Sequence, residues 1–590
     1  MTRFLCTILC AFVTLATMAA SPPDTRVALV EKGLRPANSF KGDPTWGLEE
    51  RMEHYGVPGV GIAVIHDYKV VWHRVYGIAD RTTGEPVKPD TLFQAGSISK
   101  PVSAFGALKM VDQKQLSLDD PVNDKLTSWK IPDNEFTKDA PVTLTHLTTH
   151  TGGLTVHGFP GYGVGADVPT LVQVLDGSGP ANTGPIRVDK RPGESYRYSG
   201  GGYTVMQQMM IDAGGKPFPA LMENLVLRPI GMKHSTYLQP LPPERLKKAA
   251  AGVLPDGQDV SGKRHTYPEM AAAGLWTTAE DLGLFVVEVQ LAIQGKSKVL
   301  SRAMAEAMLE PVVPQSGRGF GIEDRDGTLY FRHGGWDEGF CAQVTAHRDR
   351  GDGVAIMINS NHPDFLDEVV RAVAVAYNWN GYGVLDKQPI PKIALETYTG
   401  RYRYNAEQSF TISKKGKQLF MQYVGWKPQE LLYTGDGIYV RRERGGKITF
   451  AQEDDALVFQ FLLGGDERQT HALMGKDERT PRELLARGRR DQALAAYRKL
   501  KADEDDAAAE GYLNRAGLVL LEKDNHDLAI ALLEINCELY PESANTWDSV
   551  GYAYRAKGDV KKAMENYRKA LIVDPKFPSA VEALAELKEE

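Results

Sequence analysis

The spacing of hydrophobic residues in the first two thirds of the chain predicts strands at both ends of one domain and helices between them. The stretch GVGIAVIHDYKVVWHRVYGIAD at 59–80 is apolar and β-branched on either side of HDYK, which predicts a β-hairpin. A similar stretch, FCAQVTAHRDRGDGVAIMINS, lies at 340–360. Helical segments are predicted between them at 102–113, 201–213 and 279–290. We therefore expect an α+β domain over residues 40–380, whose sheet joins its two ends.

The pattern changes after this domain. Residues 388–472 consist of short alternating segments rich in aromatic and β-branched residues, separated by turns containing Gly, Asp and Lys. The proline-containing segment VLDKQPIPK, at 384–392, marks the upstream boundary. This region is expected to form a small antiparallel sheet or barrel.

Residues 478–590 contain an internal repeat. Three residues recur at a spacing of 34: Gly517, Ala529 and Pro541 return as Gly551, Ala563 and Pro575. This period, with small residues between helices and aromatics beside them, resembles the tetratricopeptide (TPR) repeat. RRDQALAAYRKLKAD at 489–503 resembles the second helix of a degraded earlier copy. Because so few repeats are marginally stable alone, we expect them to dock onto another part of the protein.

The N-terminal residues differ from the rest of the chain. Residues 1–20 combine Arg3, an apolar stretch and small residues near Ala20, which predicts a signal peptide and an exported protein, periplasmic or secreted. The alternative is an N-terminal membrane anchor, for which the apolar run is short. No later stretch approaches membrane-spanning length, so stable membrane insertion is not expected. The net charge of -7 gives no support to a nucleic-acid partner.

Ser97 and Lys100, in FQAGSISKPVS at 93–103, are the first candidates for chemistry. One interpretation is a helix start, with Ser97 as cap and Pro101 in the first turn. The other is a nucleophile with its base. A serine at a helix N-terminus presents its own N–H to an oxyanion, and a spacing of three places Lys100 on the same face. Burial favours a neutral, proton-accepting amine, and the two interpretations are compatible.

Two distant glycine-rich stretches could complete such a site. RPGESYRYSGGGYTVMQQ, at 191–208, offers Tyr198 as a second proton-transfer group. YFRHGGWDEGF, at 330–340, places His333 and two glycines at the edge of a predicted strand, where a substrate can approach the backbone.

These motifs, in this order, resemble the serine β-lactamase-related superfamily, which contains class C β-lactamases, D-alanyl-D-alanine carboxypeptidases and esterases. The resemblance covers about residues 40–380 and rests on S-I-S-K at 97, Y-S-G at 198 and H-G-G at 333. LTHLTTHTGGL at 144–154 and AAAGLWTTAEDL at 271–282 are also similar to the family. The resemblance implies an α+β fold of the β-lactamase and penicillin-binding-protein transpeptidase type.

The resemblance also implies roles for individual residues. Ser97 would attack a carbonyl while Lys100, with Tyr198, takes its proton, and Tyr198 would then serve the leaving group and the hydrolytic water. The backbone N–H groups of Ser97 and Trp336 would hold the oxyanion. The substrate would be bound by His333, Gly334, Gly335 and Gly200. His333 stands where many relatives have lysine.

Gly200 departs from the family pattern. Relatives that act on β-lactams or peptides commonly have an asparagine there, which contacts the substrate amide, so ester hydrolysis stays open beside those two activities. His146 and His150 have the spacing of a helical metal pair but lack the glutamate of a zinc protease, and we interpret them as structural. No metal or cofactor is predicted.

Two functions fit the sequence. The first is an exported serine hydrolase that acts through an acyl-enzyme on Ser97, with an ester, a D-amino-acid peptide or a β-lactam as its small-molecule or peptide substrate. The alternative is a protein that binds peptides or proteins through its TPR repeats and carries a relic hydrolase domain. The retention of Ser97, Lys100 and Tyr198 together favours the hydrolase.

Overall fold

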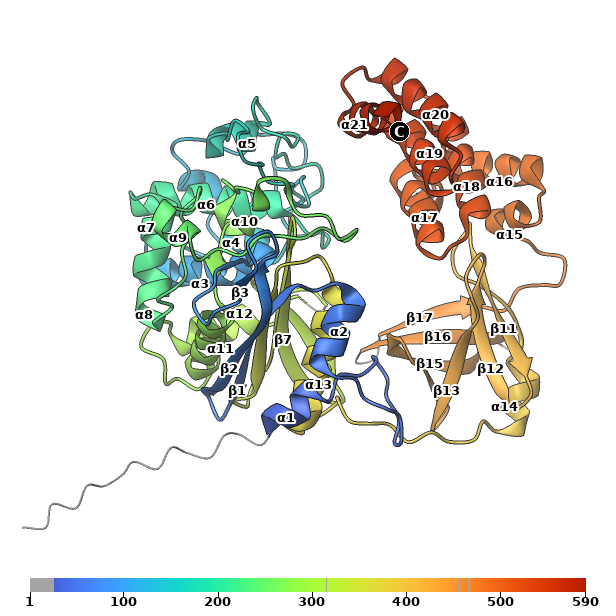
Figure 1. The fold of residues 1–590 in the computed structure, drawn as a ribbon, viewed down its shortest axis with the longest axis horizontal. Helices are drawn as coiled ribbons and strands as arrows, with labels where there is room; N and C mark the ends of the chain where they lie inside the picture. The colour runs from blue at the N-terminus through green and yellow to red at the C-terminus, as the bar shows by residue number, and fades with distance from the viewer. Residues whose placement is uncertain (1–25, 315, 455, 465–466, 590) are drawn as a thin grey trace, which may run out of the picture. The chain divides into compact units, whose positions relative to one another are not determined.

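The computed structural model describes residues 26–314, 316–454, 456–464 and 467–589. The predicted signal peptide, residues 1–20, lies outside the described residues. The chain forms two compact units, which are coloured by residue number in Figure 1. The first contains residues up to Leu34, Thr45–Glu323 and Thr328–Trp379, and the second contains Arg35–Pro44, Asp324–Gly327 and the chain from Asn380 onward.

The first unit is built on an antiparallel sheet in which the spatial order of the strands differs from their order along the chain. Within the described residues its strands follow the order β3-β2-β1-β9-β8-β7-β6. Their bounds are β1 (Gly59–His66), β2 (Lys69–Asp80), β3 (Glu85–Pro86), β6 (Gly321–Arg325), β7 (Thr328–Asp337), β8 (Phe340–His347) and β9 (Gly353–Ile358). The predicted hairpin is confirmed, with Asp67 and Tyr68 at positive φ in its two-residue turn. Pairing of β1 with β9 confirms that the sheet joins both ends of the domain.

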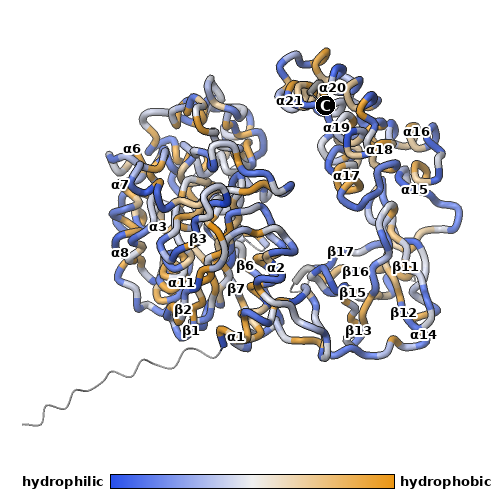
Figure 2. Tube along the Cα trace, viewed as in Figure 1, coloured by the Kyte–Doolittle hydropathy of each residue, from blue (hydrophilic) through white to orange (hydrophobic). Residues whose placement is uncertain are grey.

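Helices cover both faces of this sheet. α11 (Ala279–Ile293) packs on β1 and β9 from one side, while α13 (Pro363–Ala376) packs on β8 and β9 from the other, beside α1 (Arg26–Glu31) and α2 (Leu48–Tyr55) (Figure 1). Every residue of β1 except the last is buried, which explains its continuous apolar run. Hydrophobic stretches therefore concentrate in the sheet and its covering helices, and hydrophilic ones follow the loops (Figure 2).

A second group of helices carries the segments singled out in the sequence. α3 (Ser99–Asp112) and α6 (Gly200–Gly214) are almost entirely buried and pack against each other. The remaining elements of this unit are short: β4 (Phe93–Gln94), η1 (Gly96–Ile98), η2 (Val122–Asp124), α4 (Leu144–Thr148), α5 (Leu171–Asp176), α7 (Phe218–Met222), η3 (Glu223–Leu227), α8 (Arg228–Ile230), α9 (Pro243–Leu246), η4 (Ser261–Lys263), α10 (Met270–Ala273), β5 (Trp276–Thr277) and α12 (Arg302–Leu309). In the described chain no helix is both long and apolar enough to cross a membrane.

The second unit begins with an antiparallel sheet in which each strand pairs with the next. Its described strands are β10 (Gly400–Arg403), β11 (Ser409–Lys415), β12 (Gln418–Tyr423), β13 (Gln429–Gly435), β14 (Ile438–Arg441), β15 (Arg444–Glu453), β16 (Ala456–Gly464) and β17 (Glu467–Ala472), after α14 (Lys392–Thr397). The last strand returns to the first, since Tyr402 bridges to Leu473 and the Met474 N–H donates to the Arg401 carbonyl at 2.7 Å. The sheet thus closes around buried aromatic rings, and the predicted small antiparallel sheet or barrel is confirmed.

Helices in antiparallel pairs follow this barrel. They are α15 (Pro481–Ala486), α16 (Arg490–Ala502), α17 (Glu510–Glu522), α18 (His526–Leu539), α19 (Ala544–Ala556), α20 (Val560–Val573) and α21 (Pro578–Glu589), with a short turn η5 (Asp506–Ala508). The repeated glycines lie where two helices touch. A Cβ on Gly517 would lie 2.5 Å from the Leu533 side chain, and one on Gly551 would lie 2.7 Å from the Tyr567 ring. The predicted helical repeat is confirmed.

A buried ion pair docks the repeats onto the barrel. Arg482 of α15 bonds Glu407 of the barrel through Nε at 3.0 Å and Nη2 at 2.5 Å, with side-chain exposures of 2% and 0%. The Tyr497 and Tyr512 hydroxyls donate to the same carboxylate at 2.9 and 3.2 Å. These partners compensate for the desolvation of both charges. The expected docking of the repeats is confirmed.

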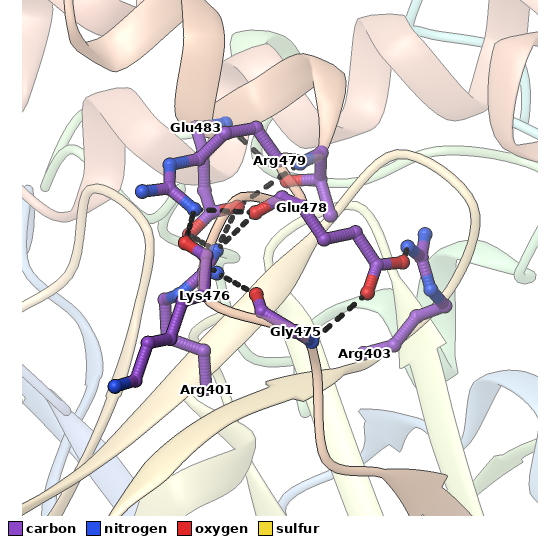
Figure 3. A network of polar contacts seen from close by, with 8 residues as sticks. Arg401, Arg403, Gly475, Lys476, Glu478, Arg479 and Glu483 are labelled. Atoms are coloured by element: carbon purple, nitrogen blue, oxygen red, sulfur yellow. Dashed lines mark hydrogen bonds and ion pairs between the residues drawn. The ribbon is translucent and has the colours of Figure 1, made fainter.

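A second, more exposed network holds the connection between the barrel and α15 (Figure 3). Arg401 of β10 donates to the Gly475 carbonyl at 2.6 Å and to the Glu483 carboxylate at 2.9 Å. Arg403, from the same strand, pairs with Glu478. The strand that starts the barrel therefore also fixes the start of the helical repeats.

We predict that Arg482→Ala will lower the free energy of unfolding of the second unit by about 3–5 kcal/mol, because it leaves the Glu407 charge buried and without its cation. Arg403→Ala is the matched control. It breaks an exposed pair and should cost less than about 1 kcal/mol. Calorimetric unfolding of the full chain measures both, and equal small losses would contradict the importance given to the buried pair.

Candidate active site

Ser97 and Lys100 lie on one continuous helical segment, in which η1 runs directly into α3. The Lys100 Nζ donates to the Ser97 Oγ at 2.8 Å and to the Ala272 carbonyl at 2.9 Å. The lysine is only 2% exposed, whereas Ser97 is half-buried. Among the described residues neither η1 nor α3 has a side-chain cap, so the interpretation of Ser97 as a helix cap is wrong. Its hydroxyl instead bonds the lysine one turn later.

The Tyr198 ring lies next to Lys100. The Lys100 Nζ is 4.9 Å from the centroid of the Tyr198 ring. Tyr198 is followed by Ser199, the N-cap residue of α6, whose Oγ accepts from the Gly202 N–H at 2.9 Å. The cap fixes the end of the helix, and with it the tyrosine.

His150 supports Tyr198 from behind, a role that the sequence analysis did not assign. The two rings stack with centroids 4.3 Å apart, and the His150 Nδ1 accepts from the Ser199 N–H at 3.1 Å. Burial, together with the nearby Lys100 and His333, lowers the pKa of His150 well below its usual value, so the ring is neutral. His146 serves elsewhere, since its Nδ1 accepts from the Thr143 N–H at 3.2 Å at the start of α4.

Two glycines bring strand β7 against the nucleophile turn. A Cβ on Gly335 would lie 1.9 Å from the Ala95 carbonyl oxygen, and one on Gly96 would lie 2.4 Å from the Trp336 backbone nitrogen. Any side chain at either position would force the strand away. The predicted oxyanion donors, the N–H groups of Ser97 and Trp336, are therefore on adjoining segments.

His333 lies on the same strand and also reaches the site. Its ring centroid is 6.4 Å from that of Tyr198, and its Nδ1 is 2.6 Å from the Gly334 carbonyl oxygen. Burial and the charge of Lys100 lower the pKa of His333 well below its usual value. His333 is thus neutral at neutral pH and offers hydrogen bonds rather than a positive charge. Gly334 leaves space, with the Ala342 carbonyl 4.0 Å from an added Cβ.

Gly200 faces a wall formed by residues 155–159. Its N–H donates to the His157 carbonyl at 2.9 Å, and the Gly201 N–H donates to the Val156 carbonyl at 3.0 Å. A Cβ on Gly200 would lie 3.0 Å from both the His157 carbonyl oxygen and the Phe159 ring. A side chain at this position would therefore require the loop to shift by a few tenths of an ångström.

The same loop brings a further histidine to the site. The His157 ring lies 4.9 Å from the Tyr198 ring and is exposed. No sequence motif signals it, because its approach depends on how the loop returns over α6. A hollow of about 300 Å³ opens beside these rings, lined by residues that include His150, Tyr196, Tyr198, Arg332, His333 and Gly334.

The structure therefore groups a hydroxyl, an amine and a phenol, with backbone donors alongside. Ser97, Lys100, Tyr198, His333 and the Trp336 backbone come together from three separate stretches of sequence. Among the described residues no group of three or more histidine, cysteine or acidic side chains is placed to hold a metal ion. The two described cysteines, Cys341 and Cys537, are buried and unpaired with each other.

Comparisons with known proteins identify the family of the chain. The model of the Beta-lactamase family matches residues 48–378, and a TPR repeat model matches residues 551–590. The chain is 26% identical to Esterase EstB of Burkholderia gladioli, over 42% of this chain and 69% of that protein. It is 27% identical to the D-alanyl-D-alanine-carboxypeptidase/endopeptidase AmpH of Escherichia coli (strain K12), over 38% of this chain and 56% of that protein.

A solved structure, the octameric penicillin-binding protein homologue from Pyrococcus abyssi, aligns with 72% of this chain and 98% of its own. The identity is 23% and the TM-score 0.48. The family match covers more than half of the 590 residues and confirms the resemblance seen in the motifs. This chain belongs to the Beta-lactamase family of serine hydrolases and carries TPR repeats at its C-terminal end.

Proposed function

We propose that this protein is a serine hydrolase that forms an acyl-enzyme on Ser97. The observation that carries the proposal is the 2.8 Å hydrogen bond between the Lys100 Nζ and the Ser97 Oγ, with the Tyr198 ring against the same amine. Serine needs such a base to attack, and family membership supports the reaction class. The same contact carries the serine proton to Lys100 once the amine is neutral.

The reaction proceeds in two displacements. As the Ser97 Oγ bonds to the substrate carbonyl carbon, its proton passes to Lys100, and the N–H groups of Ser97 and Trp336 stabilise the oxyanion. One such donor is worth about 100- to 1,000-fold in rate. Tyr198 relays the proton to the leaving group, whose bond to the carbonyl carbon then breaks. Water next attacks the acyl carbon while its proton passes through Tyr198 to the neutral Lys100, and the proton returns to the Ser97 Oγ as the bond between that oxygen and the acyl carbon breaks.

The site favours a neutral ester over a β-lactam or a D-amino-acid peptide. His333 occupies the position of the lysine in many relatives but is neutral, so it offers a substrate carboxylate no charge. Gly200 replaces the amide-binding asparagine, and residues 155–159 fill the space beside it. The relative from Burkholderia gladioli, which bears the name of an esterase, supports this choice.

The helical repeats support a second role in binding a protein partner. A hollow of about 720 Å³ lies between α17, α19 and α21, and the ring of Tyr552 on its wall is 54% exposed. The assembled Ser97, Lys100 and Tyr198 argue against a relic hydrolase domain, so we propose that binding and hydrolysis coexist.

The apolar leader at residues 1–20 supports export to the periplasm or secretion. Sequencing the N-terminus of the mature protein tests this proposal.

We predict that a fluorophosphonate will add once to the wild-type protein and not at all to Ser97→Ala, as measured by intact mass. Lys100→Ala should slow this labelling by about 100-fold or more, because the hydroxyl loses its base. Absence of an adduct on the wild type, or the same adduct on Ser97→Ala, would end the proposal.

A matched pair of aryl esters, one neutral and one with a carboxylate beside the acyl carbon, tests the substrate class. The wild type should show the higher kcat/KM on the neutral ester. His333→Lys should raise the ratio of kcat/KM for the carboxylate ester to that for the neutral ester by about 10- to 150-fold, since a charged hydrogen bond is worth about 1.5–3 kcal/mol. A wild type that prefers the carboxylate ester would contradict the neutral-ester proposal.

Gly200→Asn tests the wall beside Tyr198. We expect it to gain no activity on β-lactams or D-alanyl peptides and to lose about 1–3 kcal/mol of stability, because its side chain must displace residues 157–159. The control is Gly158→Ala in the same loop, where the described residues leave a Cβ free of contacts within 4 Å. A stable Gly200→Asn variant that hydrolyses β-lactams would show that residues 157–159 do not prevent an asparagine at this position from binding the substrate amide.

A further inference from the structure

An arginine inside the barrel of the second unit has no partner for its charge. Arg441 is the last residue of β14 and is only 8% exposed. Among the described residues its guanidinium has no hydrogen-bond acceptor, and of its three nitrogens only Nε is completely enclosed. The titratable groups that act on it are Tyr423, Arg444 and Tyr404, and no carboxylate of the described chain is among them. Because buried charges are normally paired, this cation requires an explanation.

The second unit treats its other buried arginine differently. Arg482 is fully enclosed, and the Glu407 carboxylate and the Tyr497 hydroxyl lie around it. Glu443, the acidic residue in the turn that follows Arg441, is exposed and does not take a similar place. The missing anion at Arg441 is therefore a local property of this end of the barrel.

Strand alternation directs Arg441 into the barrel. Tyr439, two residues earlier, belongs to the aromatic core of the barrel, while Val440 lies in a separate apolar cluster with Phe40. The guanidinium carbon of Arg441 is 5.2 Å from the centroid of the Phe461 ring, which packs on the same aromatic core. The guanidinium thus lies inside the barrel at the end where β14 finishes.

Rings from several strands line this end of the barrel. The centroids of Phe461 and His471 are 5.5 Å apart, and those of His471 and Tyr404 are 5.3 Å apart. The Tyr423 ring follows, 5.4 Å from Tyr404. These residues come from β16, β17, the end of β10 and β12, so the rings surround the guanidinium from separate parts of the sheet.

Two further cations lie beside these rings. Arg444 is the partner of Arg441 across the hairpin of β14 and β15, and its guanidinium carbon is 5.0 Å from the centroid of the Trp426 ring. The Lys523 Nζ is 5.6 Å from the same ring. Trp426 in turn lies 5.1 Å from Tyr423, which closes the circle of contacts. This end of the barrel therefore combines apolar rings with positive charge.

We propose that Arg441 binds the carboxylate of a small apolar carboxylic acid at this end of the barrel. A guanidinium presents N–H groups that match a carboxylate, and the charged hydrogen bonds supply the missing anion. The rings favour an apolar body on the same molecule over a bare inorganic ion. Arg444 and Lys523 add positive charge that attracts the acid. This site is separate from the function proposed for Ser97.

Titration of the full-length protein with benzoate, followed by ligand-observed NMR, tests the site. Benzyl alcohol is the neutral analogue, and inorganic phosphate is the bare ion. The wild type should bind benzoate with a Kd of about 1 mM or tighter, as expected for a ligand of this size. It should bind the other two compounds at least about tenfold more weakly, because each lacks one of the two features. No binding of benzoate, or equal binding of either comparison compound, would overturn the inference.

Arg441→Met removes the guanidinium and keeps a side chain of similar length. It should weaken benzoate binding by about tenfold or more, since a charged hydrogen bond is lost. Arg442→Met is the matched control, because Arg442 is the next residue, pairs with Asp43 and lies over the Phe40 ring. This control should leave the Kd unchanged. Equal Kd values for the wild type and Arg441→Met, or equal losses in the two variants, would overturn the inference.

Thermal unfolding without ligand separates a binding role of Arg441 from a structural one. Replacing an unpaired buried charge by an apolar side chain is neutral or stabilising, so Arg441→Met should unfold at the same temperature as the wild type or a higher one. A lower unfolding temperature would show that the guanidinium holds the barrel together, and would overturn the inference. Ser97→Ala should bind benzoate as the wild type does, so a failure of the proposed hydrolase is distinguishable from a failure of this site.

Discussion

The site depends on one close approach, between strand β7 and the turn that carries Ser97. Gly96 and Gly335 allow it, because a Cβ at either position would collide with backbone atoms of the other segment. The contact places the Trp336 nitrogen beside the nucleophile turn and aligns His333 with Tyr198. A larger residue at either glycine would push strand β7, which carries His333 and Trp336, away from the turn that carries Ser97.

The rest of the first unit keeps these segments in place. The antiparallel sheet fixes β7 between β8 and β6, while the first residues of α3 and α6 are buried and tightly packed. Two contacts hold Tyr198 in place. Its ring stacks on His150, and the neighbouring Ser199 caps α6. In the second unit, the buried ion pair between Glu407 and Arg482 joins the barrel to the helical repeats.

The sequence predicted those parts of the molecule that local patterns encode. The hairpin, the repeat and the helices at 102–113 and 201–213 follow from periodicity, and the motif order indicated that Ser97, Lys100, Tyr198 and His333 would meet. Residues that act through long-range packing carry no such signal. His157 reaches Tyr198 only because its loop folds back over α6, and Arg441 becomes unusual only once the barrel encloses it. The closure of the barrel is likewise a property of distant strands.

The central claim is that Ser97 carries the acyl group. The most direct measurement is to quench turnover of a slow neutral ester with acid and to map the acylated residue by peptide mass spectrometry. The account predicts one acyl group on the peptide containing Ser97, which accumulates further in Tyr198→Phe because hydrolysis of the intermediate is slowed. An acyl group on another residue, or turnover without any covalent intermediate in either protein, would contradict it.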